Sequence, residues 1–318
     1  MKYYIGIDIG GTSIKAGVVD QKGNPIPTGA GSCETKARRH YSEIIADIVD
    51  LVKFVIKGAG LTEAGISGIG MGIPGTIDSE AGVIIYSNNI NFENVPIVSE
   101  FRKHIDLPIK IDNDANCAAL GEVKFGSGKG YKNAVFITLG TGVGSGIIID
   151  GKIFAGRRGA GAEAGHTLLV MDGEQCTCGR RGCWEAYASA TGLIRITNEA
   201  IKKNPDSKLA QIADDDKRVS GRTAFKARKM GCPIGAEVVD LYVKYVAEGL
   251  VNIVNVFRPD VIMIGGGISN EGPYFIKMLE DYVNDHSYGG KRNPHVGIVG
   301  AKLLNNAGVL GAAALVIQ

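Results

Sequence analysis

The sequence of 318 residues has almost no net charge and no long apolar run. Its 35 Lys and Arg residues face 33 Asp and Glu residues, which leaves a formal charge of +2. Such a chain has no global field to attract phosphate backbones, so no nucleic acid is expected as a partner. Apolar runs such as 134–139 and 146–149 are far shorter than the roughly 20 residues that span a bilayer, so no membrane partner is expected either.

The N-terminus lacks the long apolar stretch of a secretory signal peptide, because Asp8 interrupts it. We therefore expect a cytoplasmic protein whose six cysteines are reduced. Hydrophobic residues make up 45% of the chain and charged residues 21%, as in an ordinary soluble globular protein. The length predicts two domains.

Glycine is the residue present in excess. The chain has 46 glycines, roughly twice the usual share. They follow no collagen period and belong to no Ser/Pro-rich low-complexity segment. We therefore expect them at backbone positions where a side chain would not fit.

One arrangement of strands and glycine turns occurs twice along the chain. Residues 3–9 predict a buried strand, followed by the turn Gly10-Gly11-Thr12 and a second strand over 13–20. About 130 residues later the strand 132–139, a glycine turn and the strand 145–150 repeat the arrangement. This indicates an approximate internal duplication and two related α/β halves.

Hydrophobic periodicity places the remaining elements. Ser42 is the expected N-cap and Gly58 the expected stop of one helix. Residues 204–233 are polar and rich in lysine, so we expect a surface excursion there. The expected helices cover 42–57, 114–125, 234–257 and the end of the chain from near Asn306, and the further strands lie near 66–73, 82–86, 108–112 and 261–264.

The glycine turns have the composition of phosphate-binding loops. Without side chains, backbone N–H groups can approach phosphate oxygens, and Thr12 can add a hydroxyl donor. Asp8, at a strand end, can hold a hydrated Mg²⁺ ion. Either turn alone could be a plain hairpin, but two in corresponding places favour a nucleotide site. Gly265-Gly266-Gly267 is a third such turn, or simply a strand-to-helix connection.

A group of cysteines indicates a metal site. His166, Cys176, Cys178 and Cys183 lie close in the sequence, and Gly179 and Gly182 permit a tight loop among them. Three cysteines and one histidine form the ligand set of a closed, structural Zn²⁺ site. The alternative is a set of free thiols.

Acidic residues supply the candidates for proton transfer. Asp114 falls between the strand 108–112 and the next helix, so it is either the cap of that helix or a general base at a strand end. Glu163 and Glu185 flank the proposed zinc ligands. Glu185 is alternatively a first-turn helix acid.

Five motifs occur in order along the chain. They are Asp8–Thr12, Asn113–Asn116, Leu139–Gly144, Glu163–His166 and Cys176–Glu185, the last being the specific Cys-x-Cys-Gly-x-x-Gly-Cys-x-Glu signature. Together they make the chain resemble the ROK family of sugar kinases and related repressors. Ala164 departs from the pattern, since many members have a larger aliphatic residue there, and this affects only the shape of the pocket.

The resemblance implies roles for these residues. Asp114 would be the catalytic base that takes the proton of the sugar 6-hydroxyl, and the cysteine group with His166 would hold structural Zn²⁺. The implied sugar contacts are Gly75, Asn88, Asn113, Asp114, Glu163, His166 and Glu185. The implied contacts to ATP and its Mg²⁺ are Asp8, Gly10, Gly11, Thr12, Gly140, Thr141, Gly142, Gly144, Gly265, Gly266 and Gly267.

The resemblance also implies the fold and the reaction. We expect a two-domain actin-like ATPase fold, related to hexokinase and ribonuclease H, with duplicated halves and a central cleft. The smaller domain would comprise residues 1–115 and 301–318, and the larger one residues 116–300. The expected activity is ATP-dependent phosphorylation of glucose to glucose 6-phosphate by a homodimer.

Two alternatives remain open. The hexose could instead be N-acetylmannosamine, N-acetylglucosamine, fructose, allose or a β-glucoside. The protein could also be a sugar-sensing member without activity. Because the first phosphate loop begins at Asp8, little room is left for the DNA-binding extension of the family's repressors.

Overall fold

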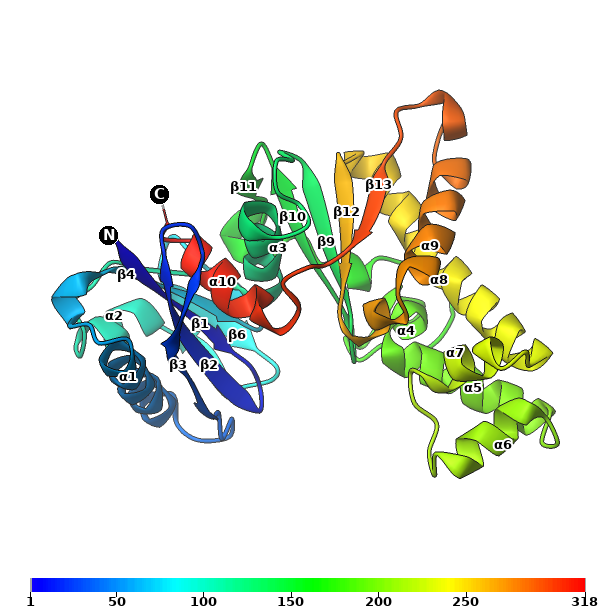
Figure 1. The fold of residues 1–318 in the computed structure, drawn as a ribbon, viewed down its shortest axis with the longest axis horizontal. Helices are drawn as coiled ribbons and strands as arrows, with labels where there is room; N and C mark the ends of the chain where they lie inside the picture. Colours follow the sequence, from blue (N-terminus) through cyan, green and yellow to red (C-terminus); the bar gives the residue numbers. More distant parts are fainter. Residues whose placement is uncertain (1, 318) are drawn as a thin grey trace. The chain divides into compact units, whose positions relative to one another are not determined.

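The structure is a computed structural model in which residues 2–317 are described (Figure 1). Two compact units form. The first comprises Met1–Phe136, Gly146–Ala162 and Lys302–Gln318, and the second comprises Ile137–Ser145 and Glu163–Ala301. The domain division expected at residues 115 and 301 stays a prediction. Met1 and Gln318, the ends of the expected smaller domain, lie outside the described residues.

A five-stranded mixed sheet forms the first unit, in the order β3-β2-β1-β4-β8. The expected opening hairpin is present, with β1 antiparallel to β2, while β1, β4 and β8 run parallel. The strands are β1 (Tyr3–Ile9), β2 (Ser13–Asp20), β3 (Pro25–Glu34), β4 (Ile66–Ile73) and β8 (Ile109–Asn113).

The two faces of β1 have different partners. Ile5, Ile7 and Ile9 are fully buried in the core that includes helix α1 (Tyr41–Gly58). On the opposite face, Gly6 lies under helix α10 (Ala307–Ala314), where a Cβ atom would stand 1.8 Å from the carbonyl oxygen of Val309. The helix backbone therefore packs directly on the strand.

Shorter elements complete the first unit. A three-stranded sheet in the order β5-β6-β7 follows β4, and α3 packs against α10. The cap of α1 is His40, whose side chain accepts the Ser42 N–H, so the expected cap at Ser42 is wrong. The bounds are β5 (Thr76–Asp78), β6 (Val83–Ser87), β7 (Phe92–Val95), α2 (Ile97–Arg102) and α3 (Asp114–Phe125).

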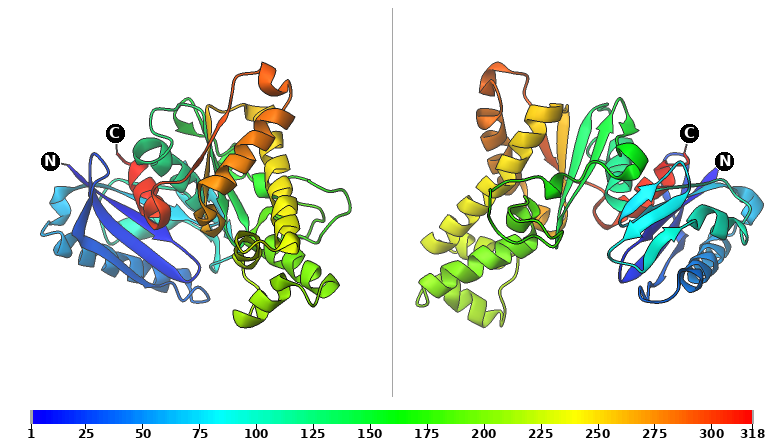
Figure 2. Two further views of the ribbon diagram at one scale, coloured as in Figure 1. Left: turned by 45° about the vertical axis from the view of Figure 1, so that its right-hand side comes forward. Right: turned by 180° about the vertical axis from the view of Figure 1, so that it is seen from behind.

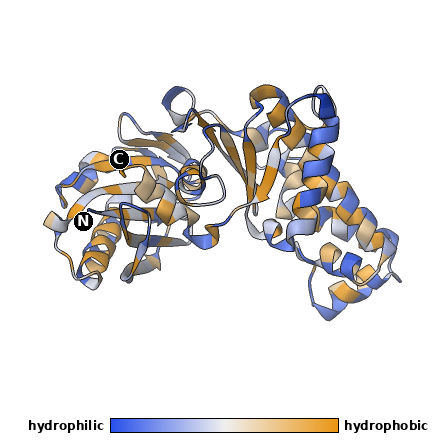
Figure 3. Cartoon of the chain, turned by 45° about the horizontal axis from the view of Figure 1, so that its top comes forward, coloured by the Kyte–Doolittle hydropathy of each residue, from blue (hydrophilic) through white to orange (hydrophobic). Residues whose placement is uncertain are grey.

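The second five-stranded sheet has the order β11-β10-β9-β12-β13. Counted along the chain, this is the same order as in the first sheet: third, second, first, fourth, fifth. The duplication inferred from the glycine turns agrees with this topology. Figure 3 shows the strands of this second sheet to be largely hydrophobic. They are β9 (Ala134–Leu139), β10 (Val143–Ile149), β11 (Lys152–Ile153), β12 (Val261–Gly265) and β13 (Gly297–Gly300).

Helices fill the rest of the second unit, and α8 and α9 lie side by side (Figure 2). The surface excursion expected over 204–233 is wrong, because two helices form there and bury Leu209 and Phe225. Phe225 packs edge-on against Phe275 of α9, with ring centroids 5.7 Å apart. The helices are α4 (Glu185–Ala188), α5 (Ala190–Lys203), α6 (Lys208–Asp215), α7 (Thr223–Lys229), α8 (Pro233–Phe257) and α9 (Pro273–His286).

Six short 3-10 helices connect these elements within residues 2–317. They are Glu63–Gly65, Arg157–Gly159, Ala164–His166, Gly267–Glu271, Gly290–Arg292 and Leu304–Asn306. Among the described residues, none of the helices has both the length and the apolar character required to cross a bilayer.

Candidate active site

The first unit gathers polar residues at the carboxyl ends of its parallel strands. Asp8 on β1 pairs with Gly72 on β4, and Gly72 in turn pairs with Asp112 on β8. Asn113 and Asp114 follow Asp112 at the same edge of the sheet. Carboxyl ends of parallel strands are where ligands bind in open α/β sheets.

Asn113 is the N-cap of α3. Its side-chain oxygen accepts the N–H groups of Ala115, at 2.8 Å, and of Asn116, at 3.3 Å. Its amide group donates to the carbonyl oxygen of Gly75, at 3.1 Å. The alternative in which Asp114 caps this helix is therefore wrong, and Asp114 is the first helical residue.

The carboxyl groups of Asp8 and Asp114 have raised pKa values. Burial is the main cause for Asp8, and the negative charge of Asp114 raises its pKa further, although the Lys15 charge offsets part of the effect. Burial also raises the pKa of Asp114, against hydrogen bonds that lower it. Two acidic groups thus lie close together, in surroundings that favour a nearby cation.

The first glycine turn is fixed by hydrogen bonds to residues of the same unit. Gly10 N–H donates to Ser13 O at 2.9 Å, and the Thr35 hydroxyl donates to Gly10 O at 2.5 Å. A Cβ atom on Gly11 would lie 3.3 Å from Asn89. The sequence pointed to Asn88, whose side-chain oxygen accepts the Tyr86 hydroxyl. Asn89, which the motifs did not single out, is the residue beside the turn.

In the second unit two glycine turns lie next to each other. A Cβ atom on Gly266, which has φ +83°, would stand 2.4 Å from the carbonyl oxygen of Leu139, just before the turn 140–144. Added Cβ atoms at Gly140 and Gly267 would meet no atom of residues 2–317 within 4 Å. These two positions therefore leave open space beside the backbone, as a phosphate-binding loop requires.

Glu185 contacts the same loop. One carboxylate oxygen accepts the Val143 N–H at 2.9 Å, and the other accepts the Thr177 hydroxyl at 3.1 Å. A Cβ atom at Gly142 would lie 2.3 Å from that first oxygen. Glu185 thus connects the predicted phosphate loop with the cysteine segment. The sequence motifs did not indicate this contact.

The segment Glu163–His166 packs on β10. Ala164 N–H donates to the Ser145 hydroxyl at 3.0 Å, and a Cβ atom at Gly165 would lie 2.2 Å from Val143 O. Glu163, His166, Glu185 and the turn 140–144 are therefore positioned within one unit. Asp8, Gly75, Asn113 and Asp114 belong to the other.

The expected zinc ligands come together. One ligand atom from each of His166, Cys176, Cys178 and Cys183 lies within 4.8 Å of the others. Cys176 Sγ is 3.7 Å from His166 Nδ1, and the sulfurs of Cys178 and Cys183 are 3.6 Å apart. Tetrahedral Zn–S and Zn–N bonds give ligand separations of about 3.5–3.8 Å, so these residues fit the ion.

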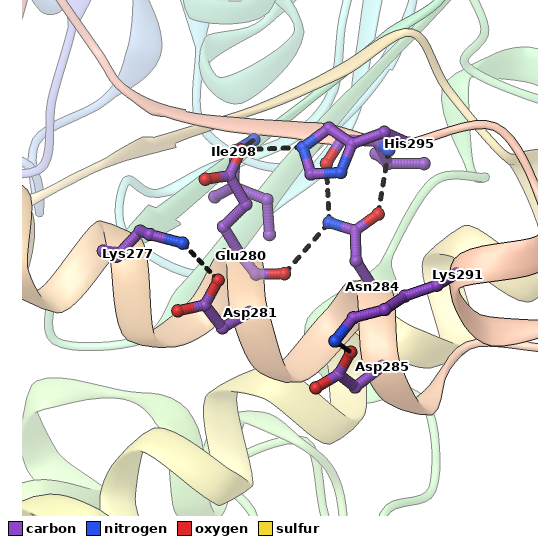
Figure 4. Close-up of polar contacts among 9 residues, drawn as sticks. Lys277, Glu280, Asp281, Asn284, Asp285, Lys291, His295 and Ile298 are labelled. Carbon is purple, nitrogen blue, oxygen red and sulfur yellow. Dashed lines mark hydrogen bonds and ion pairs between the residues drawn. The ribbon is translucent and has the colours of Figure 1, made fainter.

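A hollow of about 470 Å³ elsewhere on the second unit has no comparable chemistry (Figure 4). Three of its acidic groups contact basic neighbours. Glu280 contacts His295 Nε2 at 3.1 Å, Asp285 contacts Lys291 Nζ at 2.9 Å, and Asp281 pairs with Lys277. The first two contacts connect α9 to the segment before β13, and the third lies within α9.

Comparison with known proteins identifies the class. Residues 4–318 match the ROK family, so the chain belongs to it. It is 35% identical to a glucokinase of Streptomyces coelicolor over 98% of this chain and 96% of that one. A xylose repressor of Caldicellulosiruptor bescii is 34% identical over 85% of this chain and 67% of its own length.

The fold comparison agrees. A ROK family glucokinase from Streptomyces griseus, solved in complex with glucose and AMPPNP, matches with a TM-score of 0.81 and 32% identity, covering 98% of each chain. The predicted fold class, the α/β actin-like ATPase fold of the ROK sugar kinases, is thereby confirmed.

Asparagine at position 114 or 8 should stabilise the protein at neutral pH. A carboxyl group whose folded pKa is raised lowers stability while it is ionised. The penalty decreases as the pH falls below the folded pKa and is lost below the unfolded pKa. We expect Asp114→Asn and Asp8→Asn to raise the melting temperature at about pH 7.5 and to raise it less at about pH 4.5.

Asp20→Asn is the control of opposite sign. Although slight desolvation opposes them, hydrogen bonds from Asn24 and Lys22 lower the pKa of Asp20. Loss of the Asp20 carboxylate should lower the melting temperature at neutral pH, with a smaller effect in acid. Thermal scans of the three variants at both pH values measure the sign and the pH dependence of each change in melting temperature. Destabilisation by Asp114→Asn at neutral pH would contradict the prediction.

Proposed function

We propose that this protein is an ATP-dependent glucokinase that phosphorylates the 6-hydroxyl of glucose. The observation that carries the proposal is the capping of α3 by Asn113. The cap therefore does not depend on Asp114, although Asp114 Oδ1 also accepts the Ala115 N–H at 2.9 Å. The Asp114 carboxylate lies at a strand-end edge beside Asp8. Membership of the ROK family supports a sugar kinase, and the glucokinases among the relatives favour glucose.

Asp114 is proposed as the general base. It would orient the attacking hydroxyl and accept its proton, a contribution typically worth about 10²–10⁴-fold in rate. Its raised pKa suits this task, because a carboxylate that is easier to protonate is a stronger base. Asn113 and the Gly75 carbonyl it binds would contact the sugar next to the reacting hydroxyl.

The glycine turns are proposed to bind the phosphates of ATP. Backbone N–H groups of Gly10–Thr12 and of Gly140–Gly144 would donate to phosphate oxygens. Asp8 is a fitting partner for the Mg²⁺ that accompanies ATP, since burial and then the nearby Asp114 charge raise its pKa, and a bound cation would offset both effects. When bound, Mg²⁺ neutralises charge on the transferring phosphoryl group.

Glu163, His166 and Glu185 are proposed to bind the sugar hydroxyls. A site built to pair particular hydroxyls rejects epimers, because a buried acceptor would be left unpaired. Gly165 does not open extra room, since the Val143 carbonyl fills the space where its side chain would be. The preference for glucose over a bulkier N-acetylhexosamine is supported by the glucokinases among the relatives.

We propose that His166, Cys176, Cys178 and Cys183 hold a structural Zn²⁺ ion. The ion would fix the His166 ring and the loop that leads to Glu185, so two sugar contacts are positioned before substrate binds. Four protein ligands leave no open position, which is typical of a structural ion. The expected homodimer and cytoplasmic location stay predictions.

Asp114→Asn should fold and bind hexose but lose turnover. Asparagine keeps the shape and can hydrogen-bond the hydroxyl, yet it cannot accept the proton, so the loss should appear in kcat by about 10²–10⁴-fold. Steady-state kinetics and calorimetric glucose binding measure both parts. A variant that keeps more than about a tenth of wild-type turnover would show that Asp114 is not the base.

Purified protein should contain about one zinc per chain, because structural zinc contributes directly to folding. Cys178→Ser should lose the metal and lower the melting temperature. Cys33→Ser removes a half-buried thiol outside the ligand group and should keep the metal. Elemental analysis with thermal scans tests both variants. Metal-free protein with full activity would sink the proposal.

The substrate is tested by kcat/KM across a hexose panel. Glucose should exceed N-acetylmannosamine, N-acetylglucosamine, mannose and fructose, since each alters a hydroxyl or adds bulk at the proposed contacts. If any of them exceeds glucose by about tenfold, the glucokinase proposal is wrong while the kinase chemistry stands. Asp114→Asn serves as the inactive control.

A further inference from the structure

One ion pair of the first unit joins residues that lie close in the sequence to two proposed sugar contacts. Asp78 ends β5, three residues after Gly75, and its side chain is only 9% exposed. Its Oδ2 atom accepts from Arg158 Nε at 2.7 Å, and its Oδ1 atom accepts the Ala81 N–H at 3.0 Å. Arg158 comes five residues before Glu163.

The segment that carries Arg158 has a strained backbone. Arg158 has φ +54° and Ala162 has φ +63°. The left-handed conformation is unfavourable for a residue with a side chain. Segments keep such a conformation only where surrounding contacts hold it. Something in the structure must therefore stabilise residues 156–162.

Contacts with β5 supply that stabilisation. Gly159, with φ +71°, lies so close to the strand that a Cβ atom would stand 1.9 Å from the Ile77 carbonyl oxygen. Next to this backbone contact, the hydrogen bond from Arg158 holds the pKa of the Asp78 carboxyl below its usual value. The carboxylate is thus ionised at neutral pH and binds the guanidinium as a charged pair.

We propose that the Arg158–Asp78 pair is a latch that fixes the segment before Glu163 on β5 and thereby sets hexose affinity. The proposal rests on the proposed function, because it takes Gly75 and Glu163 as sugar contacts. Arg158 acts as a positioning residue: it holds the backbone that leads directly into Glu163. It takes no part in phosphoryl transfer.

Arg158→Met keeps the length of the side chain and removes the charged donor. We expect the KM for glucose to rise about five- to fiftyfold, since loss of orientation weakens binding by such factors. The KM for ATP and kcat at saturating glucose should change less than about twofold. Asp78→Asn should also raise the glucose KM.

Two controls separate the latch from a general loss of charge or stability. Arg157→Met removes the neighbouring arginine, which is exposed and makes no ion pair with residues 2–317. This variant should leave the KM for glucose, the KM for ATP and kcat unchanged. The double variant of Arg158→Met and Asp78→Asn should be no worse than the worse single variant, because the two residues act as one unit. Additive losses would overturn the proposal.

Hydrogen exchange tests the latch apart from activity. Amides of residues 157–163 should exchange faster in Arg158→Met than in Arg157→Met. Unchanged exchange overturns the latch, whatever the activity of the wild type. A wild type that is inactive on every hexose would instead defeat the proposed function. Faster exchange with an unchanged glucose KM overturns the link to affinity.

Discussion

The first unit depends on the direct approach of the α10 backbone to β1 and β4. Cβ atoms at Gly6 and Gly70 would lie 1.8 and 1.7 Å from carbonyl oxygens of the helix, so neither position accepts a side chain. The same packing brings Gly308 against the Asp8 carboxylate, where a Cβ atom would lie 2.5 Å from its nearest atoms. The close contact between helix and sheet thus also positions the strand-end acid.

This constraint explains why the glycine excess was informative from sequence alone. The glycine turns and the paired hairpins could be predicted, because each combines a local strand pattern with a local turn. The topology confirms them, with β1 and β2 paired in register from Tyr3 to Ile9. Glycines within strands, such as Gly70, could not be interpreted, because their partner helix lies more than 200 residues away in the sequence.

Other features depend on contacts distant in sequence and escaped prediction. The composition of 204–233 suggested a solvated excursion, yet Phe225 is 3% exposed because it packs on Phe275 of α9. Glu185 was singled out as a sugar contact, but its bond to Val143 spans 42 residues. The capping of α3 was uncertain because Asn113 and Asp114 are equally good caps. Only the backbone geometry selects Asn113.

Buried carboxylates in the first unit fall into two kinds, and the difference supports the proposed site without reference to any relative. Glu122 is 0% exposed, and its oxygens accept the N–H groups of Lys302, Leu303 and Ser127 together with the Ser127 hydroxyl. Such an acid stabilises the fold. Asp8 instead lies near a second acid, and that charge raises its pKa further. Such unfavourable pairs are typical of functional sites, and a phosphate-bound cation would relieve the repulsion.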